Sequence, residues 1–127
     1  MRADLEKMLK DKFSNLYRDI DTFQCDDGWF ELIWRLSDIV DHHCNLLPTE
    51  IKGQIHAVQV KQKFGELRFY VNHSTPYLSG AVDMAEHMSQ TICEQCGNLG
   101  IVRSISNYFF CACDIHFEEE KNRRKKT

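Results

Sequence analysis

Apolar residues in the first part of the chain recur every three or four positions, which is typical of helices with one buried face. The first run predicts a helix from about residue 3 to 20. A second helix follows Asp26 and Asp27, either of which can cap its start, and ends before Pro48. We expect the two helices to form an antiparallel hairpin. The buried positions are Leu5, Met8, Leu9, Phe13, Leu16, Tyr17 and Ile20 in the first helix, and Trp29, Leu32, Ile33, Leu36 and Val40 in the second.

The pattern changes between residues 54 and 72 to the alternation that is typical of strands. We expect a turn over residues 63–66, and a third helix that opens at Ser74 or Thr75 with Pro76 in its first turn. The expected shared faces are His56, Val58, Val60 and Phe64 on the first strand, Leu67, Phe69 and Val71 on the second, and Leu78, Ala81, Ala85, Met88 and Ile92 on the helix.

Two β-prone runs between residues 101 and 110 flank Ser106 and Asn107, a pair that suits a tight turn, and so predict a second hairpin. The order of elements indicates a small α+β domain with a helical hairpin, a β-hairpin, a third helix and a C-terminal zinc-ribbon-like knuckle. We place one domain at residues 1–116, with the ribbon-like element at 91–116, and a charged helix or tail at 117–127.

Four of the six cysteines fall within 21 residues, which in a chain without an export signal indicates a metal site before disulfides. Cys93 and Cys96, followed by Gly97, have the spacing at which two thiolates reach one tetrahedral ion. Cys113 and His116 repeat that spacing with a thiolate and an imidazole. The predicted zinc ligands are Cys93, Cys96, Cys113 and His116, with Cys111 as the alternative. Four protein ligands leave no open position, so the zinc is expected to be structural.

Composition places the chain among globular proteins, since 43% of its 127 residues are apolar and 28% are charged. Its apolar runs are far shorter than a membrane span needs. The amino terminus is charged from Arg2 onwards and lacks the apolar core of a secretory signal, so we expect a cytoplasmic protein with no membrane partner.

The last seven residues hold five bases and no acid, so the rest of the chain carries a charge of −8, against −3 for the whole. An acidic body repels duplex DNA and argues against broad contact with nucleic acid. The residues of an alternative nucleic-acid site are Arg123, Arg124, Lys125 and Lys126. The tail can instead be a self-neutralised helix, because Glu119 and Glu120 each precede an arginine by four residues.

Phe30 and Trp34 lie four residues apart, off the main buried stripe of the second helix. They can be covered by the first helix or the sheet, or they can anchor a partner protein together with an acidic helical face that includes Asp38. Sequence leaves both interpretations open.

Histidines and acids elsewhere show no recognised catalytic spacing, and no phosphate loop or nucleophile elbow is present. We therefore expect no enzymatic activity and no small-molecule substrate; a metal-dependent nuclease is the less favoured enzymatic alternative. The residues considered were His42, His43, His73, His87 with Asp83, Asp26, Asp27 and Glu31, and Cys25 as a reactive thiol.

Several short motifs, taken in this order, resemble a family of small uncharacterised bacteriophage and prophage proteins that contain a zinc ribbon. They are Cys25-Asp26-Asp27-Gly28-Trp29 with Leu32-Ile33, the segment 58–70 around Lys63-Phe64-Gly65, Cys93-Glu94-Gln95-Cys96-Gly97, and Cys113-x2-His116. Glu66, Asn98-Leu99-Gly100 and Tyr108 or Phe109 depart from the usual pattern. The resemblance implies a phage-encoded accessory protein in a bacterial host, and it supplies no reaction. We expect it to bind and inhibit or modulate a host protein, such as a component of a defence system.

Overall fold

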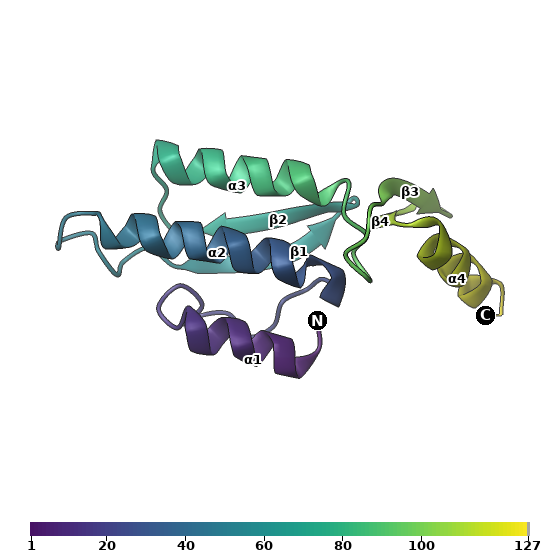
Figure 1. The fold of residues 1–127 in the computed structure, drawn as a ribbon, viewed down its shortest axis with the longest axis horizontal. Helices are drawn as coiled ribbons and strands as arrows, with labels where there is room; N and C mark the ends of the chain where they lie inside the picture. The colour runs from purple at the N-terminus through teal and green to yellow at the C-terminus, as the bar shows by residue number, and fades with distance from the viewer. Residues whose placement is uncertain (127) are drawn as a thin grey trace.

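The computed structural model describes residues 1–126, which contain four α-helices and two antiparallel β-hairpins (Figure 1). This confirms the predicted α+β class and the order of the elements. In chain order they are α1 (Ala3–Lys12), the 3-10 turn η1 (Asp27–Trp29), α2 (Phe30–Asn45), β1 (Ala57–Lys63), β2 (Glu66–Val71), α3 (Pro76–Ser89), β3 (Ile101–Ile105), β4 (Tyr108–Ala112) and α4 (Asp114–Lys125).

The elements group into two parts (Figure 1). The first, which we call the helical body (residues 1–92), has α2 and α3 side by side over the β1–β2 hairpin, with α1 beside α2. The second, which we call the metal lobe (residues 93–126), contains β3, β4 and α4 and lies at one end of the body. Large buried side chains fill the body, among them Trp29, Tyr17, Phe13 and Phe23.

The first helix is shorter than predicted, since α1 ends at Lys12 and residues 13–19 form successive turns. Ser14 and Asn15 follow the helix end, and both residue types favour turns over helix interiors. The turns bring the Leu16 carbonyl to the start of β1, where it accepts a 2.7 Å hydrogen bond from Ala57 N–H. Phe13, Leu16 and Tyr17 in these turns are nevertheless buried as predicted, and so is Ile20 directly after them. Met8 of α1, expected on the same buried stripe, is 49% exposed.

α1 and α2 run in the same direction, so the expected antiparallel helical hairpin is wrong. Arg2 N–H donates to Asp27 at the start of α2, and the ring of Phe13, just past the end of α1, packs on Trp34 further along α2. The chain returns between the helices through an extended segment, in which Gln24 forms a parallel bridge with Lys61 of β1. Gln24 N–H donates to the Val60 carbonyl and the Gln24 carbonyl accepts from Gln62 N–H, both at 2.9 Å, so this segment pairs with the edge of β1.

The β1–β2 hairpin has the predicted turn, with Phe64 and Gly65 both at positive φ as a type I′ turn requires. The expected inward face of β2 is confirmed, because Leu67 and Phe69 are buried. The expected face of β1 is wrong in part. A β-bulge between Ala57 and Gln59 changes the alternation, which buries Ala57 and exposes Val58.

α3 begins as predicted: Thr75 is its N-cap residue, its hydroxyl accepts a hydrogen bond from Leu78 N–H at 3.2 Å, and Pro76 follows. The expected cap of the second helix is not made, since Asp26 precedes η1 without a side-chain capping hydrogen bond. α2 buries the predicted face, and this face with α3 and the hairpin forms the main core.

Candidate metal centre

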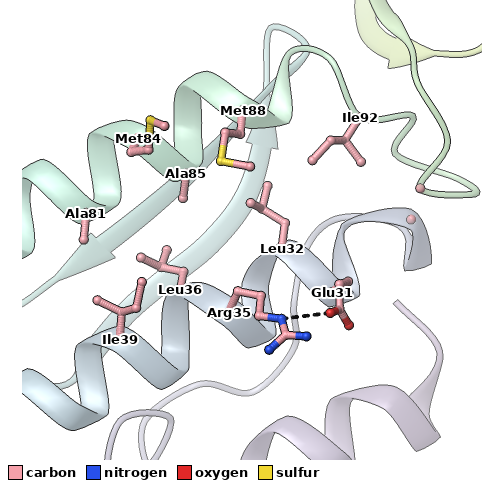
Figure 2. A pocket seen from close by; sticks show the side chains of 12 residues that line it. Glu31, Leu32, Arg35, Leu36, Ile39, Ala81, Met84, Ala85, Met88 and Ile92 are labelled. Carbon is pink, nitrogen blue, oxygen red and sulfur yellow. Dashed lines mark hydrogen bonds and ion pairs between the residues drawn. The ribbon is translucent and has the colours of Figure 1, made fainter.

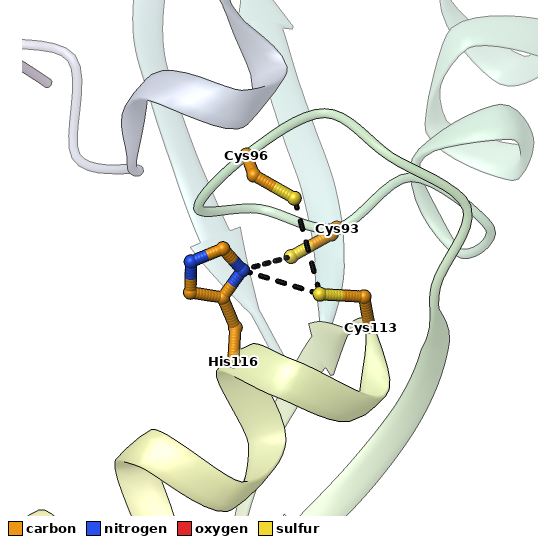
Figure 3. Close-up of side chains that lie close together, drawn as sticks. All are labelled: Cys93, Cys96, Cys113 and His116. Atoms are coloured by element: carbon orange, nitrogen blue, oxygen red, sulfur yellow. Dashed lines mark hydrogen bonds between the residues drawn. The ribbon is translucent and has the colours of Figure 1, made fainter.

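The first half of the site is a tight turn at the start of the metal lobe. Gly97 has a φ of +83°, and its N–H donates to the Cys93 carbonyl at 2.8 Å. This closes the loop, so that the Cys93 and Cys96 side chains converge (Figure 3). The N–H of Asn98 lies 3.5 Å from Cys96 Sγ and donates to it.

The second half is built on the start of α4. Cys113 is the N-cap residue of this helix, and His116 lies in its first turn. The helix therefore begins before residue 117, where the sequence placed the charged tail. A Cys-x2-His pair at a helix start suits a metal site, because the two side chains share one face and the helix N-terminus favours a thiolate.

The four predicted ligands meet: their donor atoms all lie within 4.8 Å of one another (Figure 3). His116 Nδ1 is 3.2 Å from Cys113 Sγ and 3.6 Å from Cys93 Sγ, and the sulfurs of Cys96 and Cys113 are 3.9 Å apart. A tetrahedral ion with bonds of about 2.3 Å to sulfur and about 2.0 Å to nitrogen requires edges of about 3.8 Å and about 3.5 Å. These three distances lie within about 0.3 Å of the tetrahedral edges, and all the donor atoms lie within 4.8 Å of one another, so the cluster can hold a metal ion.

Hydrogen bonding prepares one thiol for this role. The His116 backbone N–H, followed by its ring, lowers the pKa of Cys113 to about 7. On the far side of the ring, His116 Nε2 is 3.8 Å from a Glu119 carboxylate oxygen, a second contact that orients the imidazole. Burial raises the pKa of Cys111 to about 11, and this cysteine lies in the main core and not in the cluster. The geometry favours Cys113 over the alternative ligand.

The site is joined to the helical body by the residues around Gly28. Its N–H donates to the Glu94 carbonyl at 2.6 Å, and Trp29 Nε1 donates to the Ile92 carbonyl at 2.9 Å. A Cβ at Gly28 would overlap the carbonyls of Cys93 and Glu94, so only glycine fits. The Asp-Gly-Trp motif is therefore the joint between the body and the metal-binding turn.

A second joint involves the turn after β1. Gln62 Nε2 donates to the Phe109 carbonyl at 3.1 Å, and a Cβ at Gly65 would lie 2.7 Å from a Val102 methyl group. The Lys-Phe-Gly motif thus packs against the β3–β4 hairpin. The separate motifs noticed in the sequence meet at this one boundary.

Glu94 carries a buried carboxyl group between the two cysteines of the turn, and it was not among the predicted site residues. Its side chain accepts a 2.9 Å hydrogen bond from Asp26 N–H, and burial, with the nearby charge of Asp26, raises its pKa to about 7. Cys25 beside it is a poor nucleophile, since burial raises its pKa to about 12. A reactive role for the Cys25 thiol, one of the possibilities considered from the sequence, is therefore not supported.

The other candidate residues are spread over the surface of the helical body. His42, His73 and His87 are exposed, whereas the His43 ring stacks on Tyr77 at 4.5 Å. Among residues 1–126 the Cys93–His116 cluster is the group of three or more side chains that can converge on a metal ion.

Phe30 and Trp34 are both half-buried and pack against the main core. The Trp34 ring meets the Phe13 ring edge-on, with centroids 5.1 Å apart. Asp38 is exposed further along α2. The amino-terminal segment therefore covers part of this aromatic pair, in line with the first of the two interpretations.

An apolar groove that the sequence did not indicate lies between α2 and α3, with a volume of about 370 Å³ (Figure 2). Met84 and Met88 form its α3 wall, and Leu36 and Ile39 its α2 wall. Met84 is 61% exposed, and Met88, expected in the core stripe, is 42% exposed. The sequence signals only some of its residues, since Ile39 and Met84 are apolar positions just outside the predicted buried stripes of the two helices.

The basic tail continues α4. Arg123 and Arg124 both pair with Glu120, and the Arg124 guanidinium also lies over the Tyr108 ring at 4.6 Å. The predicted self-neutralisation is present with one changed partner, since Glu119 faces His116 instead of Arg123. Lys125 and Lys126 are exposed, and Thr127 lies outside the described residues.

Within residues 1–126, the helices lack the length and apolar character that a membrane crossing requires. Comparison with known protein families, curated proteins and solved structures finds no match for this chain.

Proposed function

We propose that this protein carries a structural zinc ion and acts, without catalysis of its own, by binding another protein in the α2–α3 groove. Three thiolates and one imidazole are a donor set typical of structural zinc sites, and together they fill all four positions of a tetrahedral ion. A catalytic zinc needs one position open for water or substrate. The zinc is thus assigned to folding and the groove to function.

The exposed apolar side chains of the groove lining, Ile39, Met84 and Met88, carry the protein-binding part of the proposal. Exposed methionines such as Met84 and Met88 are common on surfaces that bind the apolar side of another protein, because the flexible thioether adapts to its contacts. Water-exposed apolar area of this kind is costly unless a partner covers it. The resemblance to phage proteins favours a protein of a bacterial host as that partner.

Nucleic-acid binding is the weaker candidate. Two of the four tail residues that would contact phosphates already pair with Glu120. On the outer face of β1–β2, Arg68 likewise pairs with Glu66 at 2.7 Å. Paired cations release fewer counterions on binding DNA, so their contribution to affinity is reduced.

Photo-crosslinking from the groove tests the proposed function. A photoreactive residue placed at position 84 is expected to give a nuclease-resistant protein adduct in bacterial cells. The matched control is position 8, because Met8 is also exposed but lies on α1 away from the groove. Adducts that form equally from both positions, or that vanish after nuclease treatment, would contradict groove-mediated protein binding.

A further inference from the structure

The α2–α3 groove has the dimensions of a site for a short helix. α3 rises about 10 Å from Ala81 to Met88, at about 1.5 Å per residue. Ile92 extends the apolar wall beyond the helix end, as Figure 2 shows. Gly28 and Gly97 line one end next to the metal-binding turn, and the His43–Tyr77 stack joins the two helices farther along. An occupant of about three helical turns fits this length.

The walls determine what that occupant must present. Leu32, Leu36 and Ile39 face Ala81, Met84 and Met88 across the groove (Figure 2). Such a surface recognises the apolar stripe of an amphipathic helix, whose side chains at i, i+3, i+4 and i+7 enter together. A polar or extended peptide would leave its backbone groups without partners against these apolar walls.

The charged residues of α2 and α3 determine which charge the polar face of an occupant should carry. α2 and α3 carry five acidic residues and one basic residue, Arg35, which already pairs with Glu31 at 2.9 Å. Asp38 is exposed beside Ile39 of the groove wall. The acidic residues are Glu31, Asp38, Asp41, Asp83 and Glu86, and of these Glu86 faces the hairpin, where its carboxylate accepts a hydrogen bond from Phe69 N–H, so the other four contribute charge to the outer surface. A helix with lysines or arginines flanking its apolar stripe complements this surface, whereas an acidic helix is repelled.

From these observations we infer that the α2–α3 groove binds a basic amphipathic helix of a partner protein. This inference rests on the proposed function and names the partner class for the same groove. The apolar stripe supplies the buried contact area, and the basic flanks supply orientation and selectivity against acidic helices.

Two synthetic helical peptides test this inference. The first has about 18 residues, long enough to be helical alone, with leucines on one face and lysines on the other. The second is the same peptide with every lysine replaced by glutamate. Fluorescence anisotropy with the whole zinc-loaded protein should show binding of the lysine peptide and at least about tenfold weaker binding of the glutamate peptide, a difference of about 1.4 kcal/mol. Asp38→Asn should weaken the lysine peptide selectively.

Variants locate the binding. The double substitution Met84→Gln with Met88→Gln keeps side-chain size but should weaken the lysine peptide about tenfold, while Met8→Gln on α1 should leave its affinity unchanged. Equal affinity for both peptides, or no binding of either, overturns the inference. So does a dimer of this protein that the double variant dissociates, because a second copy would then fill the groove. A position-84 adduct without lysine-peptide binding would retain the proposed function and reject this partner class.

Discussion

The helical body and the metal lobe are stabilised by different means. The body buries large side chains such as Trp29, Tyr17 and Phe13 in one contiguous core. In the lobe, the described residues give a cluster of only three buried residues, Cys93, Phe110 and Ala112. A lobe with so little buried apolar area cannot offset the entropy of ordering its chain. We expect a metal bound by the three cysteines and His116 to supply the stability that the few buried apolar residues of the lobe do not.

Loss of the metal should therefore unfold the lobe while the body stays folded. We expect this to be the largest effect on stability of any single change. Cys96→Ser or Cys113→Ser is expected to abolish zinc binding and unfold the lobe, since a structural zinc contributes on the order of 10 kcal/mol to folding. The body should retain its helices. Elemental analysis measures the metal, and amide hydrogen exchange measures the two regions separately.

Cys111→Ser is the matched control, because Cys111 lies in the same lobe but outside the cluster. It should keep one zinc per chain. If Cys111→Ser loses the zinc while Cys113→Ser retains it, the ligand assignment is wrong. A lobe that stays protected from exchange after complete chelation would refute the stated difference between the regions.

The joint between the two regions can be tested without touching a ligand. Gly28→Ala places a methyl group against the Cys93 and Glu94 carbonyls, and these backbone atoms can move only if the metal-binding turn moves. We expect a loss of about 3 kcal/mol in unfolding free energy, at the upper end of overpacking costs. Urea denaturation, followed by tryptophan fluorescence, gives the value.

Gly80→Ala provides the comparison, because an added Cβ there meets nothing within 4 Å and the residue lies inside α3. Replacing glycine in an open helical position should raise stability by about 0.5–1 kcal/mol. Equal effects of the two substitutions would show that the contact between Gly28 and the turn does not couple body and lobe.

The sequence predicted the metal-ligand cluster better than the body that supports it. Ligand spacing is a local property, so Cys93-x2-Cys96 and Cys113-x2-His116 could be assigned from the chain alone. Spacing left Cys111 open as an alternative to Cys113, because the start of α4, which orients Cys113 and His116 together, was not predicted.

The errors in the body have a common physical origin. Periodicity identifies residues that face inwards but not how the backbone brings them there, so Phe13 and Tyr17 in turns gave the same signal as a helix. The β-bulge after Ala57 changed the face of Val58 in the same way. The groove was missed because it depends on the distance between α2 and α3, which no local pattern contains.

The smallest effect is expected at the end of the lobe, in the basic tail. Lys125→Gln with Lys126→Gln should change the unfolding free energy by less than about 0.5 kcal/mol, as is usual for exposed surface positions.

The same double substitution also tests the nucleic-acid alternative. If the tail, together with Lys61 and Lys63 of β1, neutralised about four phosphates, affinity for duplex DNA would fall roughly a hundredfold between about 50 and about 200 mM salt. The double variant would then flatten that dependence. Because Glu120 already engages Arg123 and Arg124, we expect only weak DNA binding and a slope that the substitutions hardly alter. Tight binding at the higher salt that these two substitutions remove would make the tail, and not the groove, the functional surface.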